Sequence, residues 1–458
     1  MHLRNFLFLI ITGFILFTAC DKDDTSPPDD PGEPTDTIPE VPDFEVPATG
    51  DIIMYEVNLR AFSQGGDLQG VIDRLNHLKD LSVNVIWLMP IHPTGQINSV
   101  NSPYSVKNYK EVGAEYGTFD DLVELTDEAH ARGMAVIMDW VANHTAWDNP
   151  WIYDHPEWYS QDGSGNIIIP PGTNWQDVAD LNFDNPQMRL AMIDAMKYWV
   201  TQANVDGFRC DYADGVPYDF WQQAIDSLHD IPGREYILLA EGERDDHFDA
   251  GFDLTFGWNF YATMKSVFEG QSATALYNTH KNVYEEIPAG HHRLRFTTNH
   301  DESAWDATPM VLFDGQQGAL AASAVTTFMG GVPLIYTGQE VGRVQALPFF
   351  SNDPVNWNNN PAMLQEYEEL MAVYASCEPA KYGTATDYSG ADVVCFTREH
   401  NSDELLLIAN MRDENQTRTL PAEISNSTWE NALTGEMVSL TQQVELAGYQ
   451  YLILSRQR

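Results

Sequence analysis

Short apolar runs rich in β-branched residues alternate, from residue 51 onward, with longer segments in which apolar residues recur at helical spacing. This alternation is typical of parallel strands joined by crossover helices. Eight runs have the length and composition of strands, and they span residues 52–57, 83–89, 135–140, 205–212, 236–240, 252–256, 293–298 and 332–336. Several are separated by amphipathic stretches, at 68–81, 120–132, 187–203 and 217–228. We therefore expect an α/β fold, a (β/α)8 TIM barrel over residues 50–380, with catalytic groups at the carboxyl ends of its strands.

Two segments depart from this pattern. The connection 142–185, between the third and fourth predicted strands, is rich in Trp, Tyr, Gly and Pro, and it indicates a short inserted subdomain beside the site. After residue 380 the chain changes to short strands, predicted at 393–398, 404–410, 417–421 and 449–454. Residues 381–458 are therefore expected to form a C-terminal antiparallel β-sandwich.

The first 20 residues have the pattern of an export signal, with Arg4 before an apolar stretch that is short for a spanning helix. Their ending, Phe17-Thr18-Ala19-Cys20, resembles a bacterial lipobox, which implies cleavage before Cys20 and a membrane anchor through a lipid on that cysteine. Secretion without a lipid and an uncleaved anchor are the alternatives. Residues 21–49, rich in Pro and Asp, are expected to form a disordered tether. The acids after Cys20 resemble a surface-export signal of Gram-negative lipoproteins, so an outer-membrane, cell-surface location is expected.

The formal charge of −44, from 24 Lys and Arg against 68 Asp and Glu, argues against nucleic acid as a partner. A strongly acidic surface repels the phosphate backbone. A neutral ligand fits better, because the 12 Trp, 20 Tyr and 21 Phe include flat faces on which sugars stack, although most of them belong to the core. The oligomeric state is left open by these observations.

Carboxylates stand where four of the predicted strands end. Asp211 follows the fourth strand, and the two-residue period of a strand places it on the same side as Arg209, which favours its ionised form. Glu241 emerges from the apolar fifth strand, whose surroundings raise the pKa of a carboxyl, as an acid catalyst requires. Asp301 follows the seventh strand, and Asp139 lies near the end of the third. Singly, each is more often a helix cap or surface ion pair; together they suggest a pair of carboxyl groups for glycoside hydrolysis.

These acids lie in ordered blocks that read DWVANH at 139–144, GFRCD at 207–211, AE at 240–241 and NHD at 299–301. With them come DLNFDNP at 180–186 and GVPLIYTGQE at 331–340. In this combination the chain resembles glycoside hydrolase family 13, the α-amylase family, from about Asp51 to its C-terminus. The resemblance implies a retaining glycosidase that cleaves α-glucosidic linkages of starch-like α-glucans or malto-oligosaccharides.

The resemblance also implies a role for each matching residue. Asp211 would form the covalent glycosyl intermediate, Glu241 would be the general acid/base, and Asp301 would hold two hydroxyls of the sugar. Asp139 would support the architecture of the site. Substrate-binding roles fall on a further set, which is Arg209, His144, His300, Tyr104 and Asn299. Read alone, either histidine could equally be a core residue.

No cofactor is required for this chemistry, and a structural calcium ion is the one metal to consider. The family's common calcium site would use Asn143 and Asp180, but position 215, where the family has a His, is Gly, which argues against calcium. Export permits a disulfide, and Cys377 with Cys395 is the one pair to consider. Transglycosylation or isomerisation through the same intermediate, and glycan binding without chemistry by a surface lipoprotein, remain alternatives.

Overall fold

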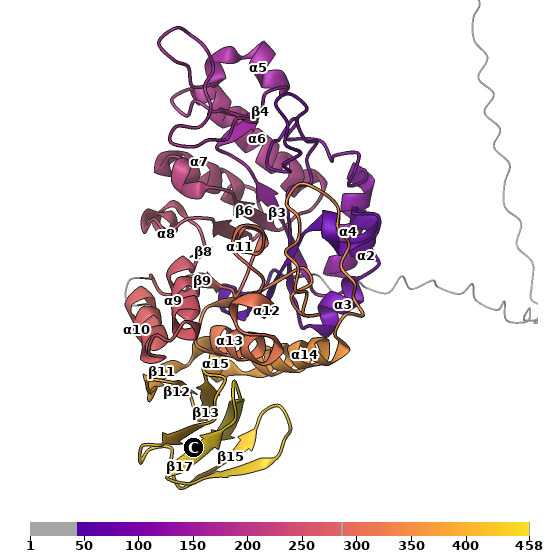
Figure 1. Cartoon of the computed structure of the whole chain (residues 1–458). Helices are drawn as coiled ribbons and strands as arrows, with labels where there is room; N and C mark the ends of the chain where they lie inside the picture. Colours follow the sequence, from indigo (N-terminus) through magenta and orange to yellow (C-terminus); the bar gives the residue numbers. More distant parts are fainter. Residues whose placement is uncertain (1–43, 285–286, 458) are drawn as a thin grey trace, which may run out of the picture. The chain divides into compact units, whose positions relative to one another are not determined.

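The computed structural model describes residues 44–284 and 287–457; the predicted signal peptide, Cys20 and residues 21–43 of the predicted tether lie outside them. Eight parallel strands close into a barrel in the order β1-β10-β9-β8-β7-β6-β3-β2. Figure 1 labels β3, β6, β8 and β9 of this barrel among the surrounding helices. Their bounds are β1 Met54–Val57, β2 Val85–Leu88, β3 Ala135–Trp140, β6 Gly207–Cys210, β7 Ile237–Ala240, β8 Leu254–Phe256, β9 His292–Arg295 and β10 Val332–Tyr336. The predicted (β/α)8 barrel is confirmed, and each predicted strand run contains or overlaps one of these strands.

Most of the strands are apolar on both faces because one face fills the barrel and the other packs under helices. Met54, Val85 and Leu254 belong to the interior cluster, whereas Tyr55, Ile86 and Phe208 pack outward. This two-sided burial explains why the strands read as continuous apolar runs. Gly207 starts β6 with a φ of 150°, and a Cβ there would clash with the backbone oxygen of Ile237, so glycine lets β6 approach β7 closely.

Helices surround the barrel, and the four amphipathic predictions all fall on helices. The stretch predicted at 68–81 is two helices, because the chain leaves helical geometry at Arg74, whose φ is −116° and ψ 12°. The helices of the barrel are α1 Leu59–Phe62, α2 Leu68–Ile72, α3 Leu75–Asp80, α4 Phe119–His130, α6 Pro186–Gln202, α7 Tyr218–His229, α8 Asp246–Ala250, α9 Trp258–Phe268, α10 Thr274–Tyr284, α11 His300–Trp305, α12 Pro309–Leu312, α13 Gln316–Phe328, α14 Pro361–Ser376 and α15 Glu378–Tyr382. Short 3₁₀ helices occupy Thr49–Asp51 and Ala213–Gly215. Among the described residues, no helix is both long and apolar enough to span a membrane.

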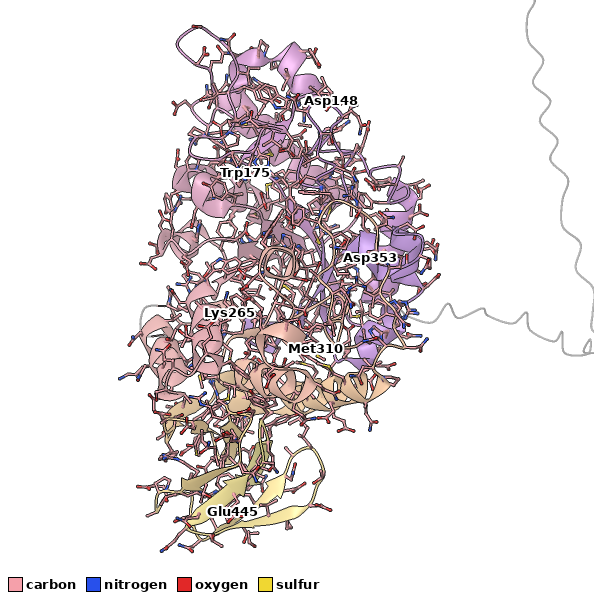
Figure 2. The ribbon with its side chains drawn as sticks, viewed as in Figure 1. Asp148, Trp175, Lys265, Met310, Asp353 and Glu445 are labelled. Atoms are coloured by element: carbon pink, nitrogen blue, oxygen red, sulfur yellow. The ribbon has the colours of Figure 1, made fainter. Side chains whose placement is uncertain are left out.

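The aromatic connection after β3 forms its own small unit. It holds the antiparallel pair β4 (His144–Ala146) and β5 (Val178–Asp180), with α5 (Pro150–Asp154) and a 3₁₀ turn at Pro156–Trp158 between them. Tyr159 is buried there, and its hydroxyl shares a hydrogen bond with Thr145. Trp175, labelled in Figure 2, belongs to the same connection.

The C-terminal segment contains a six-stranded antiparallel sheet of order β11-β12-β13-β18-β15-β16 and a separate pair, β14-β17. Their bounds are β11 Thr384–Asp387, β12 Val393–His400, β13 Asp403–Asn410, β14 Gln416–Thr419, β15 Ser427–Asn431, β16 Met437–Leu440, β17 Gln443–Leu446 and β18 Tyr451–Gln457. The antiparallel β character is as predicted, and a separate core around Trp429 fills it. Cys210, Cys377 and Cys395 are all free, so the disulfide considered between the last two is absent from the described residues.

Candidate active site

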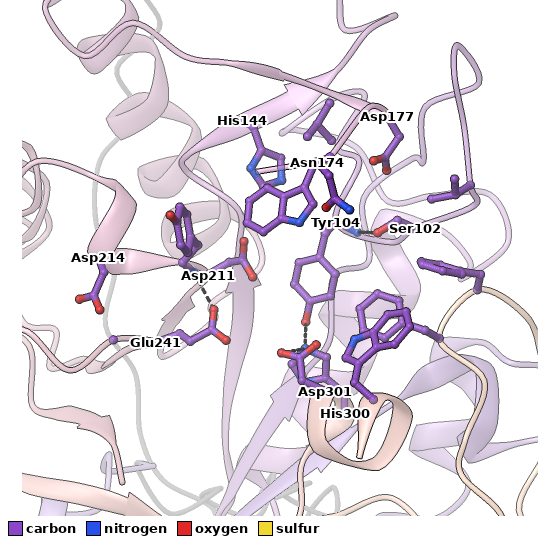
Figure 3. Close-up of a pocket in the computed structure, with 18 of the residues that line it drawn as sticks. Ser102, Tyr104, His144, Asn174, Asp177, Asp211, Asp214, Glu241, His300 and Asp301 are labelled. Carbon is purple, nitrogen blue, oxygen red and sulfur yellow. Dashed lines mark hydrogen bonds and ion pairs between the residues drawn. The ribbon is translucent and has the colours of Figure 1, made fainter. Parts of the chain in front are cut away.

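The carboxyl ends of the barrel strands open into a pocket of about 880 Å³. Figure 3 shows Asp211, Glu241 and Asp301 turned toward this one space. Asp211 is the first residue after β6, Glu241 the first after β7, and Asp301 lies in the first turn of α11. The structure therefore brings together three acids that are separated by 30 and 60 positions in the sequence.

Arg209 is the centre of charge beneath the pocket. Its Nη1 lies 2.8 Å from Asp139 and 3.0 Å from Asp211, and its Nη2 lies 2.9 Å from Glu241. The guanidinium is fully buried and also packs over the ring of Trp87, 5.0 Å from its centroid. One cation therefore serves three carboxylates, which holds the two proposed reacting groups close together.

Burial raises the pKa of both Asp211 and Glu241, Arg209 opposes this shift, and neighbouring carboxylates add to it. The predicted rise at Glu241 agrees with the structure. At Asp211 the sequence predicts that Arg209 keeps the carboxyl ionised, whereas the net direction is upward, because burial outweighs that one shared charge. Because Asp211 and Glu241 share one guanidinium, the pair favours a state in which one carboxyl is protonated and the other ionised. A general acid and a nucleophile require this state.

Tyr104 and His300 form a hydrogen-bonded chain along one wall. The Tyr104 hydroxyl donates to Asp139 over 2.9 Å and lies 2.8 Å from Nε2 of His300, while Nδ1 of His300 contacts buried Glu56. Burial alone lowers the pKa of His300, but Asp301 and Glu56 raise it to about 9, so the ring is an imidazolium near neutral pH. Both His300 nitrogens then donate, and the Tyr104 and His300 rings stack at 5.4 Å.

His144 lines the pocket from the start of β4, and its ring meets Trp175 edge to face at 5.4 Å. Burial lowers its pKa to about 4, so it is neutral at physiological pH and can donate or accept a hydrogen bond. His144 and His300 therefore bring different charges to the same site. The sequence alone did not distinguish them.

Two residues with predicted substrate-binding roles lie beneath the pocket and do not line it. Arg209 is fully buried, and its ion pairs are made with carboxylates of the protein. Asn299 is fully buried, and its Oδ1 caps α11 by accepting a hydrogen bond from the Glu302 amide over 2.8 Å. Asn299 therefore orients the turn that carries Asp301, and its contact with the sugar stays a prediction.

The residues considered for calcium do not form a metal cage. Asp180 is paired with His144 in the β4-β5 ladder, and burial raises the pKa of its carboxyl to about 6. A Cβ built on Gly215 would lie 3.0 Å from Asn143 Oδ1 and even closer to the Tyr212 ring, which occupies this space. Within residues 44–284 and 287–457, no group of three or more His, Cys, Asp or Glu could hold a metal ion. The residues present do not fit a calcium ion here.

Aromatic side chains that sequence analysis did not single out complete the pocket wall. Trp258 starts α9, Trp305 ends α11, and Phe349 and Phe350 come from the loop after β10. Trp175 and Tyr212 face them from the other side, in edge-to-face contact at 5.2 Å. Such faces stack on sugar rings. These residues stand at helix ends and in loops far apart in the sequence, so only the closed barrel reveals that they share a site.

A closed (β/α)8 barrel with paired carboxyl groups at its strand ends and aromatic walls defines a protein of the glycoside hydrolase class. The model of the alpha-amylase catalytic domain matches residues 18–166 and 172–372. The chain therefore belongs to the α-amylase family, as the resemblance of its blocks indicates.

Individual relatives agree with this assignment. "Alpha-amylase MalA" of Haloarcula japonica is 29% identical over 83% of this chain, which spans 58% of the length of that relative. A crystal structure of an alpha-amylase from Lactobacillus plantarum superposes with a TM-score of 0.80 at 26% identity, covering 89% of this chain and 99% of that one. The crystal structure of a noncanonic maltogenic alpha-amylase from Thermotoga neapolitana also superposes with a TM-score of 0.80. Its sequence is 27% identical, and the match covers 90% of this chain and all of that one.

Proposed function

We propose that this protein is a retaining glycosidase that cleaves α-glucosidic linkages in starch-like glucans or malto-oligosaccharides. The observation that carries the proposal is the contact of Asp211 and Glu241 with neighbouring nitrogens of one guanidinium, at 3.0 and 2.9 Å. Retaining enzymes hold their two carboxyl groups about 5 Å apart, whereas inverting enzymes need a wider gap that admits water. Two carboxylates on one guanidinium favour the shorter separation.

Hydrolysis then proceeds in two displacements. Asp211 attacks the anomeric carbon while Glu241 gives its proton to the departing glycosidic oxygen, which leaves as an alcohol. Glu241, now ionised, takes a proton from water, whose oxygen attacks the same carbon and releases Asp211. Asp301, with its side chain one-third exposed in the pocket, is placed to accept hydrogen bonds from sugar hydroxyls. His144 and His300 line the same space as possible partners for the sugar.

Replacement of Asp211 by Asn tests this function. Hydrolysis of maltoheptaose is expected to fall by about 10⁴-fold or more, because no carboxylate remains to form the intermediate. Product chromatography would show short malto-oligosaccharides from the native enzyme, and near-normal turnover by the variant would refute the assignment. Longer or rearranged glucosides as main products would instead establish transglycosylation or isomerisation. Binding of maltoheptaose without product from the native protein would establish a glycan-binding lipoprotein.

Export and a lipid anchor on Cys20 are a separate part of the proposal. They rest on the signal-like first 20 residues and the lipobox-like ending at Cys20, which lie outside the described part of the chain. Expression with radiolabelled palmitate in a Gram-negative host should label the native chain and not the Cys20→Ser variant. Equal labelling of both chains would refute the anchor, and exposure of intact cells to protease would test the surface location.

A further inference from the structure

Two buried arginines lie where the barrel meets the C-terminal sheet. Arg295 ends β9 and is 1% exposed, and Arg398, on β12, is 6% exposed. Their hydrogen bonds go to neutral carbonyls: Arg295 Nε donates to Gly330 over 3.1 Å, and Arg398 donates to Pro379 over 2.8 Å. No carboxylate among the described residues pairs with either guanidinium. Buried charges usually have a counter-charge, because removing an ion from water is costly.

The groups that surround the Arg295 guanidinium are neutral rings and a second arginine. Nη2 of Arg295 lies 3.5 Å from Nδ1 of His280, and its guanidinium packs over the ring of Phe260 at 4.2 Å. A Cβ built on Gly330 would lie 2.5 Å from Arg398 Nη1 and 2.8 Å from His280 Cε1, so the second arginine borders the same imidazole. Burial lowers the pKa of Arg295 to about 10, which leaves it charged at neutral pH. In a chain of net charge −44, two guanidiniums with no carboxylate partner in the described part of the chain are unusual.

A small cavity lined by buried residues adjoins Arg295 on the outer side of the barrel wall. It measures about 10 Å³ for the centre of a water-sized sphere, which is room for one water or one small ion. Arg295 Nη1 and Thr326 Oγ1 are buried without a hydrogen-bond partner, and both residues line it. Thr297 accepts from Gln339 over 2.9 Å, which leaves its own hydroxyl proton to donate. The lining also includes Ser323, Thr327 and Tyr367, and no carboxylate.

We propose that this cavity binds one small monovalent anion, of the size of chloride, beside Arg295. Hydroxyl donors and a guanidinium without a carboxylate partner suit an anion, whereas a cation would meet only repulsion from Arg295. A water molecule would satisfy Thr326 but would leave the charge of Arg295 uncompensated. The anion would neutralise the junction between the barrel and the C-terminal sheet. No residue that lines this cavity also lines the active-site pocket, so its role is structural.

The melting temperature of the full chain tests this site. In sodium chloride and in sodium gluconate of equal ionic strength, the native protein should melt several degrees higher in chloride, with saturation, because a bound ion stabilises only the folded state. Thr326→Val keeps the shape of the side chain and removes one hydrogen-bond donor, so the rise in melting temperature that is specific to chloride should become smaller. Arg295→Met removes the charge at similar length and should abolish it. Thr126→Val is the matched control, since Thr126 is a buried helical threonine away from this cavity, bonded to Ala203, and it should keep the full rise.

Crystals grown in bromide give a direct readout. An anomalous peak beside Arg295 and Thr326 is expected, and it should vanish in the Arg295→Met protein. Equal melting temperatures in chloride and gluconate for the native chain would overturn the proposal. So would density without anomalous signal at the cavity, which would identify a water molecule.

Discussion

The backbone amide of Tyr212 donates a 2.7 Å hydrogen bond to Oε2 of Glu241, across the ends of β6 and β7. Tyr212 directly follows Asp211 and adopts a left-handed conformation, with φ 43° and ψ 47°, that is uncommon for a residue other than glycine. Such conformations concentrate at functional sites. The amide favours the ionised form of Glu241, which is the form present after its proton has moved to the leaving group.

Replacement of Glu241 by Gln should separate the two steps of the reaction. Substrates whose leaving oxygen needs a proton are expected to slow by about 10²–10⁴-fold, whereas aryl glucosides that leave as stable anions should slow less. Azide, which attacks without a general base, should restore turnover of the aryl substrate as glucosyl azide. Glu235→Gln, at the exposed opposite end of β7, is the control and should retain native rates. Equal losses on both substrate types would contradict the role of Glu241.

Removal of the charge of Arg209 should change both stability and the pH profile. In the Arg209→Met protein, three buried carboxylates lose their shared counter-charge, and the free energy of unfolding is expected to fall by about 3–5 kcal/mol. Because Arg209 lowers the pKa of Asp211 and of Glu241, the acidic limb of kcat/KM against pH should move to higher pH. Arg209→Lys keeps a charge and should show a smaller shift. An unmoved acidic limb in both proteins would contradict this account.

His300 should make stability fall at alkaline pH. Its folded pKa of about 9 lies above the ordinary 6.5, so its stabilising contribution is complete below pH 6.5 and is lost as the pH rises through 9. Urea unfolding of the native protein between these pH values should therefore show a decreasing free energy of unfolding. The His300→Gln protein should lack this part of the decrease. Parallel curves for the two proteins would contradict the prediction.

Asp214 is expected to position the loop that follows Glu241. Its carboxylate accepts hydrogen bonds from the amides of Glu243 and Arg244, at 3.2 and 3.3 Å, and contacts His247 Nε2 at 2.7 Å. Asp214→Ala should release this loop and lower kcat by roughly tenfold, because small displacements of a catalytic group are costly. Asp214→Asn keeps an acceptor oxygen and should recover most of the rate. Steady-state kinetics on a short malto-oligosaccharide, with kcat and KM resolved, would check this, and a native kcat in the alanine protein would refute it.

The barrel was predictable from the sequence because its strands are buried on both faces and appear as apolar runs. In the C-terminal segment, sequence analysis missed β11, β15, β16 and β17, which are short and partly exposed, so that their pattern resembles that of loops. It also missed β4 and β5, which have three residues each and are too short to form a pattern. The seventh run was predicted to reach 298, but β9 ends at Arg295, and the chain then turns into α11 with Asn299 as its cap. The local pattern of apolar residues does not show where the hydrogen-bonded pairing between two strands ends.

The chemistry of Asp211, Glu241 and Asp301 was indicated by the sequence alone, because each carboxylate stands at a strand end within an ordered block. The tertiary structure decided how their charge is shared. Arg209 pairs with three carboxylates at once, His300 is charged while His144 is neutral, and aromatic residues from distant helix ends and loops line the pocket. Protonation depends on burial and on neighbours brought together by barrel closure, and neither can be read from positions along the chain.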